Sequence, residues 1–180
     1  MENKMQSARI LVVDDEPDLQ ELIRQKFRHK IKANEYEFHF AVNGAEAMEK
    51  ISNDVSIDLI LTDINMPVMD GLTLLTKINE LNNRFLKAVI VSAYGDMENI
   101  RTAMNRGAYD FITKPINLID LEITIEKSLK EIENYKQILS SQNNLIALQQ
   151  ELDIATVIQT SILPKKFPPF PDRKEFDIYA

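Results

Sequence analysis

The sequence predicts a doubly wound α/β domain with a five-stranded parallel sheet in the order 2-1-3-4-5, extended by a long C-terminal helix. Two patterns support this prediction. From Arg9 to about Asn117, short apolar runs alternate with amphipathic stretches, which is typical of βα units joined by right-handed crossovers. From Leu118 to about Leu163 there is neither glycine nor proline, which favours one uninterrupted helix.

The individual elements follow from local patterns. The first helix places Leu19, Ile23 and Phe27 on one face, after a proline suited to a first helical turn. The second strand alternates apolar and polar residues, which suits an edge strand with one solvated face and makes His39 an exposed strand residue rather than a ligand. The expected strands are Arg9–Val13, Tyr36–Ala41, Leu59–Thr62, Ala88–Ser92 and Asp110–Thr113, and the expected helices are Asp18–Lys32, Gly44–Ser52, Leu72–Asn82 and Met97–Arg106.

Composition narrows the class of protein. With 180 residues the chain has room for one full domain and an appendage. The absence of cysteine excludes a disulfide scaffold or a zinc ribbon and fits a reducing compartment. Because the apolar runs are short and the first residues lack a signal peptide's apolar core, we expect a cytoplasmic protein with no membrane partner. A net charge of −7 argues against a nucleic-acid-binding surface.

The long helix carries a seven-residue repeat. We expect its first turns to pack on the sheet, whereas the rest extends beyond the domain and needs another partner. A long row of apolar residues at this spacing favours a coiled coil, most simply a parallel homodimer through Leu118–Leu163. The alternative is that the helix packs within its own chain. From Leu145 the apolar positions shift in phase. The first set is Leu118, Ile125, Ile132, Leu139 and Ile146, with Leu121, Ser128, Tyr135, Gln142 and Gln149 three places later; the second is Leu145, Leu148, Leu152, Ala155 and Ile162.

Three carboxylates lie where strands end. Asp14 and Asp15 follow the first strand, and Asp63 follows the third. Because the carboxyl ends of neighbouring parallel strands open on the same crevice, we expect these acids to meet. Such a cluster repels itself unless it holds a cation, and oxygen ligands alone select a hard ion such as Mg²⁺. The tight loop after Asp63 lets the backbone carbonyl of Asn65 turn inward as a further ligand.

A hydroxyl and an ammonium flank the acids. Ser92 ends the fourth strand and Lys114 the fifth, before Pro115, and the Lys114–Pro115 bond is one that can be cis. Taken singly, a serine such as Ser92 more often leads into a helix, and a lysine such as Lys114 is more often a surface charge. Together with Mg²⁺ they would meet a phosphoryl group on Asp63, and charge neutralisation and positioning are what phosphoryl transfer requires.

This combination resembles the receiver domain of two-component response regulators, over about residues 8 to 130. The resemblance implies a flavodoxin-like fold, with Asp63 as the phosphoacceptor. It implies that Asp14, Asp15 and the Asn65 carbonyl organise Mg²⁺, and that Ser92 and Lys114 hold the phosphoryl group. The donor would be a phosphohistidine on a sensor histidine kinase or phosphotransfer protein, or a small acyl phosphate.

The same resemblance assigns Phe111 to the family's aromatic switch position. Many relatives carry tyrosine there, so Phe111 can rotate inward but cannot form the hydroxyl's hydrogen bond. A receiver catalyses only its own phosphorylation and dephosphorylation, so we expect this chain not to be an enzyme in the usual sense.

A second resemblance concerns the C-terminal end. The stretch from Glu151 to Pro164, followed by Phe167-Pro-Pro-Phe-Pro171, is similar to the start of the metal-dependent serine/threonine phosphatase domain of the PPM type found in sporulation and sigma-factor regulators. It implies a receiver at 8–130, a helical coiled-coil linker at 131–163 and, at 164–180, a proline-rich crossover into a truncated output domain. The partners of that output would be anti-sigma or anti-sigma antagonist proteins.

Other functions stay open. A response regulator could carry a DNA-binding or cyclic-nucleotide output, although no helix-turn-helix pattern follows the linker, or it could act as a stand-alone receiver dimer. A haloacid dehalogenase also uses an aspartyl phosphate. That class needs Asp-x-Asp after the first strand, whereas Asp14 and Asp15 are adjacent and Asp63 follows the third strand.

Overall fold

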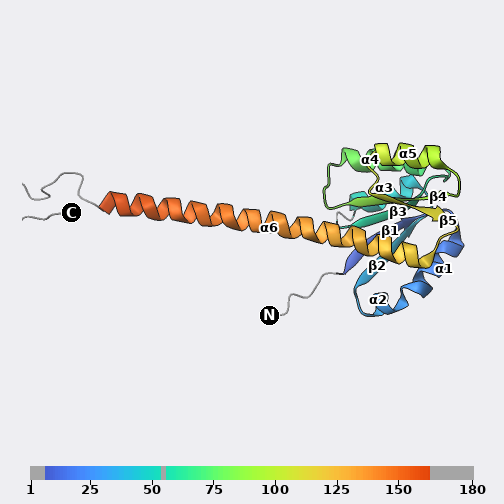
Figure 1. The fold of residues 1–180 in the computed structure, drawn as a ribbon, viewed down its shortest axis with the longest axis horizontal. Coiled ribbons are helices and arrows are strands. Elements are labelled where there is room, and N and C mark those ends of the chain that lie inside the picture. Colours follow the sequence, from blue (N-terminus) through green and yellow to red (C-terminus); the bar gives the residue numbers. More distant parts are fainter. Residues whose placement is uncertain (1–6, 54–55, 163–180) are drawn as a thin grey trace, which may run out of the picture. The chain divides into compact units, whose positions relative to one another are not determined.

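The protein is described here from a computed structural model, which places residues 7–53 and 56–162. Its parallel sheet has the predicted order, β2-β1-β3-β4-β5 (Figure 1). The strands are β1 (Ala8–Val13), β2 (Tyr36–Ala41), β3 (Leu59–Asp63), β4 (Lys87–Ala93) and β5 (Asp110–Lys114). The helices are α1 (Pro17–Lys26), α2 (Arg28–Lys32), α3 (Gly44–Asn53), α4 (Gly71–Glu80), α5 (Met97–Asn105) and α6 (Leu118–Ile162). The predicted fold class is therefore confirmed.

Two apolar cores cover the two faces of the sheet. Successive residues of a strand point to opposite faces, so neighbours such as Ile10 and Leu11 enter different cores. The core against α3, α4 and α5 contains Leu11, Ile60 and Ile90. The core on the other face contains Ile10, Leu59 and Val89 together with side chains of α1 and α6. Figure 1 shows the same division of helices between the faces. A parallel sheet covered on both faces explains the nearly continuous apolar runs of its central strands.

The first helix differs from the prediction. The sequence pattern predicts one helix over Asp18–Lys32, but α1 ends at Lys26 and α2 begins at Arg28, because Phe27 leaves the helical conformation with φ −96° and ψ 13°. The ring of Phe27 is buried against two aromatic rings of β2, with centroids 5.9 Å from Tyr36 and 5.4 Å from Phe38. Helical periodicity identifies the buried face correctly but does not detect this contact with a later strand.

Strand β2 lies at the edge of the sheet, as predicted. His39 is half-buried rather than fully exposed, and its Nε2 lies 3.2 Å from Oε1 of Glu37, two residues earlier on the same face of the strand. Its place in the strand agrees with the expectation that His39 is a strand residue.

The chain divides into two compact units, residues 1–136 and 137–180. Within the first unit, the root of α6 packs on the sheet as expected, because Leu121, Ile125 and Ile132 are buried. In the second unit, the residues described from Gln137 to Ser161 are helical and exposed. Leu163 and the expected crossover at 164–180 lie outside the described residues. None of the helices in the described ranges is long and apolar enough to span a membrane.

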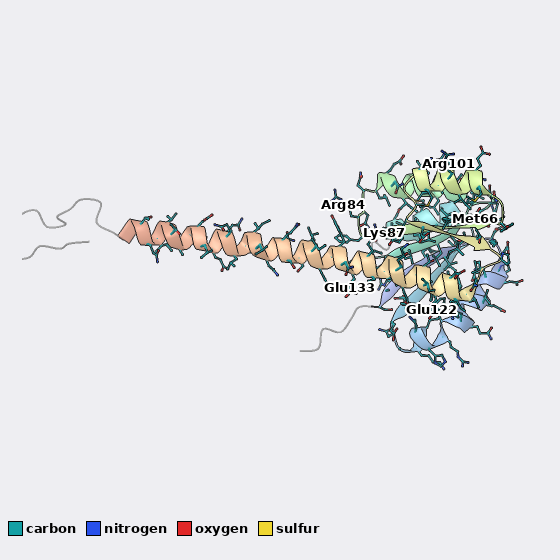
Figure 2. The ribbon with its side chains drawn as sticks, viewed as in Figure 1. Met66, Arg84, Lys87, Arg101, Glu122 and Glu133 are labelled. Carbon is teal, nitrogen blue, oxygen red and sulfur yellow. The ribbon has the colours of Figure 1, made fainter. Side chains whose placement is uncertain are left out.

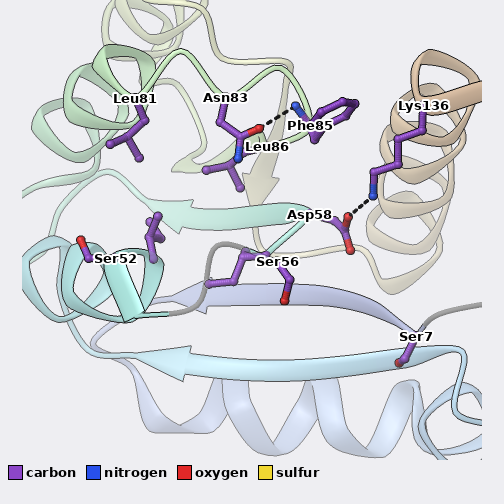
Figure 3. Close-up of a pocket in the computed structure, with 11 residues that line it drawn as sticks. Ser7, Ser52, Ser56, Asp58, Leu81, Asn83, Phe85, Leu86 and Lys136 are labelled. Atoms are coloured by element: carbon purple, nitrogen blue, oxygen red, sulfur yellow. Dashed lines mark hydrogen bonds and ion pairs between the residues drawn. The ribbon is translucent and has the colours of Figure 1, made fainter. Parts of the chain in front are cut away.

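Loops at the amino ends of the strands contact α6 near residue 136, where the first unit ends. Lys136 forms an ion pair with Asp58 at 2.8 Å (Figure 3), and the ring of Tyr135 lies 5.7 Å from that of Phe85. The Tyr135 hydroxyl also accepts a hydrogen bond from Arg84 at 2.9 Å; Figure 2 shows Arg84 among the other side chains. A pocket of about 540 Å³ lies beside these contacts and is lined in part by Ser7, Asp58 and Leu86. It therefore lies at the end of the sheet where the strands begin. Asp63 and Lys114 lie at the opposite end, where β3 and β5 end.

Candidate functional site: an acidic cluster around Lys114

The carboxyl ends of three strands bring together the residues predicted from sequence. Asp14 directly follows β1, Asp63 is the last residue of β3, and Lys114 is the last residue of β5. In the parallel register Val13 lies opposite Thr62, and Asp63 opposite Val91. Neighbouring strands in this register end on the same side of the sheet, so groups that are far apart in the sequence meet at their carboxyl ends.

Lys114 lies at the centre of this cluster. Its Nζ is 3.0 Å from Oδ2 of Asp63, 3.1 Å from Oδ2 of Asp14 and 3.1 Å from Oε1 of Glu16. Burial alone would lower the pKa of Lys114, but the hydrogen bonds to Asp63, Asp14 and Glu16 hold that pKa above its usual value. The ammonium therefore stays charged, and it offsets one of the three negative charges around it.

Backbone groups orient the two buried carboxylates. Oδ1 of Asp63 accepts a hydrogen bond of 2.7 Å from the N–H of Ile64, and Oδ1 of Asp14 accepts one of 2.8 Å from the N–H of Glu16. In each carboxylate the other oxygen, Oδ2, bonds to Lys114. Burial raises the pKa of Asp14 more than the bonds from the Glu16 N–H and Lys114 lower it. Burial of the charged form of Asp14 therefore costs free energy, and ionisable groups with a perturbed pKa are characteristic of functional sites.

Glu16 is the member of this group that the sequence patterns did not identify. One oxygen each from Asp14, Glu16 and Asp63 lies within 4.8 Å of the others, a spacing that can hold a metal ion. Asp15 is exposed and lies outside this group, and Asn65 is exposed in the loop after Asp63. The metal-binding roles expected for Asp15 and for the Asn65 carbonyl stay predictions. The acidic run from 14 to 16 was the available signal for Glu16.

The loop after Asp63 is held by its neighbours in space. The Gly71 N–H donates to the carbonyl of Ile64 at 2.9 Å, and Asp70 caps α4 by accepting a hydrogen bond from the Thr73 N–H at 2.6 Å. A Cβ on Gly71 would lie 2.1 Å from the carbonyl oxygen of Asp63. Only glycine therefore permits this close approach of the two backbones, and the approach fixes the position of Asp63.

Ser92 lies in β4, where it pairs with Thr113 of β5, and Phe111 lies earlier in β5, opposite Ile90. Ser92 is fully buried and its hydroxyl donates to Oδ2 of Asp96 at 3.3 Å; this Asp96 oxygen also accepts from Nδ2 of Asn99 at 3.0 Å. Phe111 is 38% exposed on β5. The Lys114–Pro115 peptide bond is cis, the form that an X-Pro bond can adopt at low cost. The expected roles of Ser92 and Phe111 stay predictions.

Residues 10–126 match the family described as the response regulator receiver domain. Because the match covers more than half of the chain, the protein belongs to the response regulator receiver domain family. Receiver domains bind Mg²⁺ at an acidic pocket, and this structure has an acidic group formed by Asp14, Glu16 and Asp63. A receiver also implies a phosphodonor such as a sensor kinase, and it is not an enzyme in the usual sense.

Individual relatives support this assignment. The chain is 32% identical to the regulatory protein AtoC of Escherichia coli over 139 residues, which cover 74% of this chain and 29% of AtoC. It is 30% identical to the transcriptional regulatory protein PrrA of Mycobacterium tuberculosis, covering 72% of this chain and 53% of PrrA. A CheY-like receiver domain protein from Methanospirillum hungatei has a similar structure, with a TM-score of 0.64 and 33% identity, covering 72% of this chain and 98% of that one. The chain thus spans about a third to a half of the length of these curated relatives.

Proposed function

We propose that this chain is a phosphorylation-dependent receiver that accepts a phosphoryl group on Asp63. The donor would be a phosphohistidine on a sensor histidine kinase or phosphotransfer protein, or a small acyl phosphate. The observation that carries this proposal is the arrangement of Asp63: one carboxylate oxygen is fixed by a backbone N–H and the other bonds to Lys114. An oriented carboxylate beside a permanent cation is suited to in-line attack on phosphorus.

The chemistry assigns a role to each group. A carboxylate oxygen of Asp63 forms a bond to phosphorus while the bond from phosphorus to the donor's nitrogen or acyl oxygen breaks. Lys114 then exchanges a carboxylate for a phosphoryl oxygen and keeps its charge. Asp14, together with Asp15, the Asn65 carbonyl or Glu16, would hold Mg²⁺, which supplies charge neutralisation for the phosphoryl oxygens.

Phosphorylation would change the position of Ser92. Its hydroxyl bonds to Asp96 in the structure, so gripping the phosphoryl group requires that bond to break. Movement of Ser92 would open space that Phe111 can fill from its present, partly exposed position. The face formed by α5, β5 and α6 would then change shape, which is how a local charge can reach a distant output.

Intact mass measurement tests the phosphoacceptor. Incubation with acetyl phosphate and Mg²⁺ should add one phosphoryl group, and Asp63→Asn should abolish the addition. Asp58→Asn is the matched control, because Asp58 lies at the opposite end of the strands, just before β3. This substitution should leave the addition of the phosphoryl group intact. Chelation of Mg²⁺ should prevent labelling. Labelling that persists in Asp63→Asn, or that Asp58→Asn also abolishes, would reject the proposal.

We further propose that α6 transmits the signal, as a homodimeric coiled coil, to an output of the PPM phosphatase type, with anti-sigma or anti-sigma antagonist proteins as its partners. The similarity of the segment from Glu151 to Pro171 supports this output. The competing output is a DNA-binding domain, because NtrC of Escherichia coli, 28% identical over 134 residues, is described as a DNA-binding transcriptional regulator. The coding sequence after Ala180 distinguishes them: Gly-Gly-Asp followed by metal-binding aspartates supports the phosphatase, and a helix-turn-helix supports DNA binding.

A further inference from the structure

The long helix carries two apolar stripes, and the receiver unit already uses the first. The stripe that begins at Leu118 continues through Leu121, Ile125, Ser128 and Ile132. The last four of these are buried, and all lie within the first compact unit. Side chains that pack on the sheet of their own chain are not available to a partner. The heptad pattern in this part of the helix therefore reflects packing within the chain.

The same heptad phase continues poorly in the second unit. Its next positions are Leu139, Gln142, Ile146, Gln149, Asp153, Thr156 and Thr160, of which only two are apolar. Gln149 and Asp153 bond to each other along the helix surface, with Nε2 to Oδ1 at 2.9 Å. Polar side chains that satisfy one another in this way are typical of a solvated helix face.

A phase one residue earlier is far more apolar. It places Ile138, Leu145, Leu152 and Gln159 at the first core position of each heptad, and Ser141, Leu148, Ala155 and Ile162 at the second. Ile138, Leu145, Leu148 and Leu152 are all more than half exposed. From Ile138 to Ile162 the repeat runs for about three and a half heptads, which is the length at which a coiled coil is expected.

The residues that flank this seam favour pairing with an identical helix. The positions before and after the core are Gln137, Gln142, Asn144, Gln149, Glu151, Thr156 and Ile158, of which only Glu151 is charged. In a parallel pair Glu151 faces Thr156 of the other copy, so no like charges oppose each other. In an antiparallel pair the position of Glu151 faces its own equivalent, which brings two negative charges together. Parallel pairing also places Gln159 opposite Gln159, where the two amides can bond.

We infer that a second copy of this chain binds along Ile138–Ile162, in parallel and in register, through the seam of Leu145, Leu148 and Leu152. The inference rests on the proposed homodimer and specifies its contact surface. It replaces the expected seam from Leu118 with one that begins after the receiver unit. The receiver keeps its own helix face buried in both the single and the paired state.

Cysteine cross-linking tests this register, because the chain contains no cysteine of its own. Single variants Leu148→Cys and Leu152→Cys would be oxidised in the full chain and the covalent dimer measured on a non-reducing gel. Disulfides need Cα atoms about 4.4–6.8 Å apart, a distance that only core positions of a parallel pair offer, so both variants should cross-link at least about tenfold faster than Gln150→Cys. Gln150 lies on the outer side of the proposed pair.

Each other outcome overturns the inference in a recognisable way. Faster cross-linking of Ile146→Cys and Gln149→Cys would assign the contact to the first heptad phase. Cross-linking only in a mixture of Leu145→Cys and Ala155→Cys chains would show antiparallel pairing. Absence of dimer from every variant, with a monomeric mass in sedimentation of the unsubstituted chain, would remove the homodimer. Phosphoryl transfer to Asp63 is measured separately and would be unaffected by any of these results.

Discussion

Replacement of Gly71 by alanine should distort the phosphoacceptor site directly. A Cβ at this position would lie 2.1 Å from the carbonyl oxygen of Asp63 and 3.0 Å from its carbonyl carbon. Contacts of Cβ atoms below 3.0 Å essentially never occur, so the two backbone segments must separate by about 0.9 Å, the difference between 3.0 and 2.1 Å. Both segments are backbone, so no side chain can rotate to relieve the contact.

The cost can be estimated from this geometry. Overpacking typically costs about 1–3 kcal/mol, and a backbone-to-backbone contact belongs at the upper end of that range. The φ of Gly71 lies outside the left-handed region, so alanine adds no conformational strain and gains about 0.4–1 kcal/mol by restricting the unfolded chain. We therefore expect a net loss of about 2 kcal/mol, which lowers Tm by roughly 6–10 °C for a domain of this size.

Gly95→Ala is the matched control. Gly95 has φ +90° and nothing within 4 Å of an added Cβ, so its cost is conformational and amounts to about 1–2 kcal/mol. The two variants thus lose similar stability for different reasons. Only Gly71→Ala should also slow phosphorylation of Asp63, because only that change displaces the carboxylate.

The assay combines urea unfolding with the rate of labelling by acetyl phosphate, measured by intact mass. We expect Gly71→Ala to be less stable and to be labelled slowly, and Gly95→Ala to be less stable but to be labelled at the rate of the unsubstituted chain. If Gly71→Ala labelled as fast as the unsubstituted chain, the close approach of Gly71 would not be what positions Asp63.

Three further substitutions test local features of the same domain. Val68 is 86% exposed and has φ +67°, a backbone conformation that strains a β-branched residue but suits asparagine. Val68→Asn should therefore raise the free energy of unfolding, measured in urea, by about 1 kcal/mol. An unchanged free energy would show that Val68 is not strained. Burial raises the pKa of Asp14, so the folded state binds that proton more tightly and loses stability as the pH rises through the folded pKa. Without Mg²⁺, Asp14→Asn should therefore have a higher Tm than the unsubstituted chain at pH 7 but not below about pH 4, near the usual pKa; exposed Asp15→Asn should show no such difference. Asp96→Ala removes the acceptor to which the Ser92 hydroxyl now donates, so Ser92 is free to bond to a phosphoryl analogue. Because the lost hydrogen bond is worth under about 1 kcal/mol, beryllofluoride should bind about threefold more tightly. Unchanged or weaker binding would refute this.

Much of the fold and part of the site follow from local sequence. Continuous apolar runs predict buried parallel strands, and Asp14 and Asp63 follow from where those runs end. Glu16 could not be predicted in the same way, because three consecutive acids follow β1 and the path of the loop decides which side chains turn toward Lys114. The break at Phe27 depends on a contact with Phe38, whose position periodicity does not encode.

The heptad pattern of α6 shows why periodicity alone does not name a partner. A seven-residue apolar repeat arises whenever one face of a helix is buried, whether the burying surface is a sheet or a second helix. Burial of Leu121, Ile125 and Ile132 assigns the first part of the repeat to the sheet. The phase of the apolar positions changes after Tyr135, where the first unit ends and the buried part of the helix stops. A helix that packs on its own domain with one stripe and on another copy with a second stripe requires two independent stripes, and the phase shift supplies them.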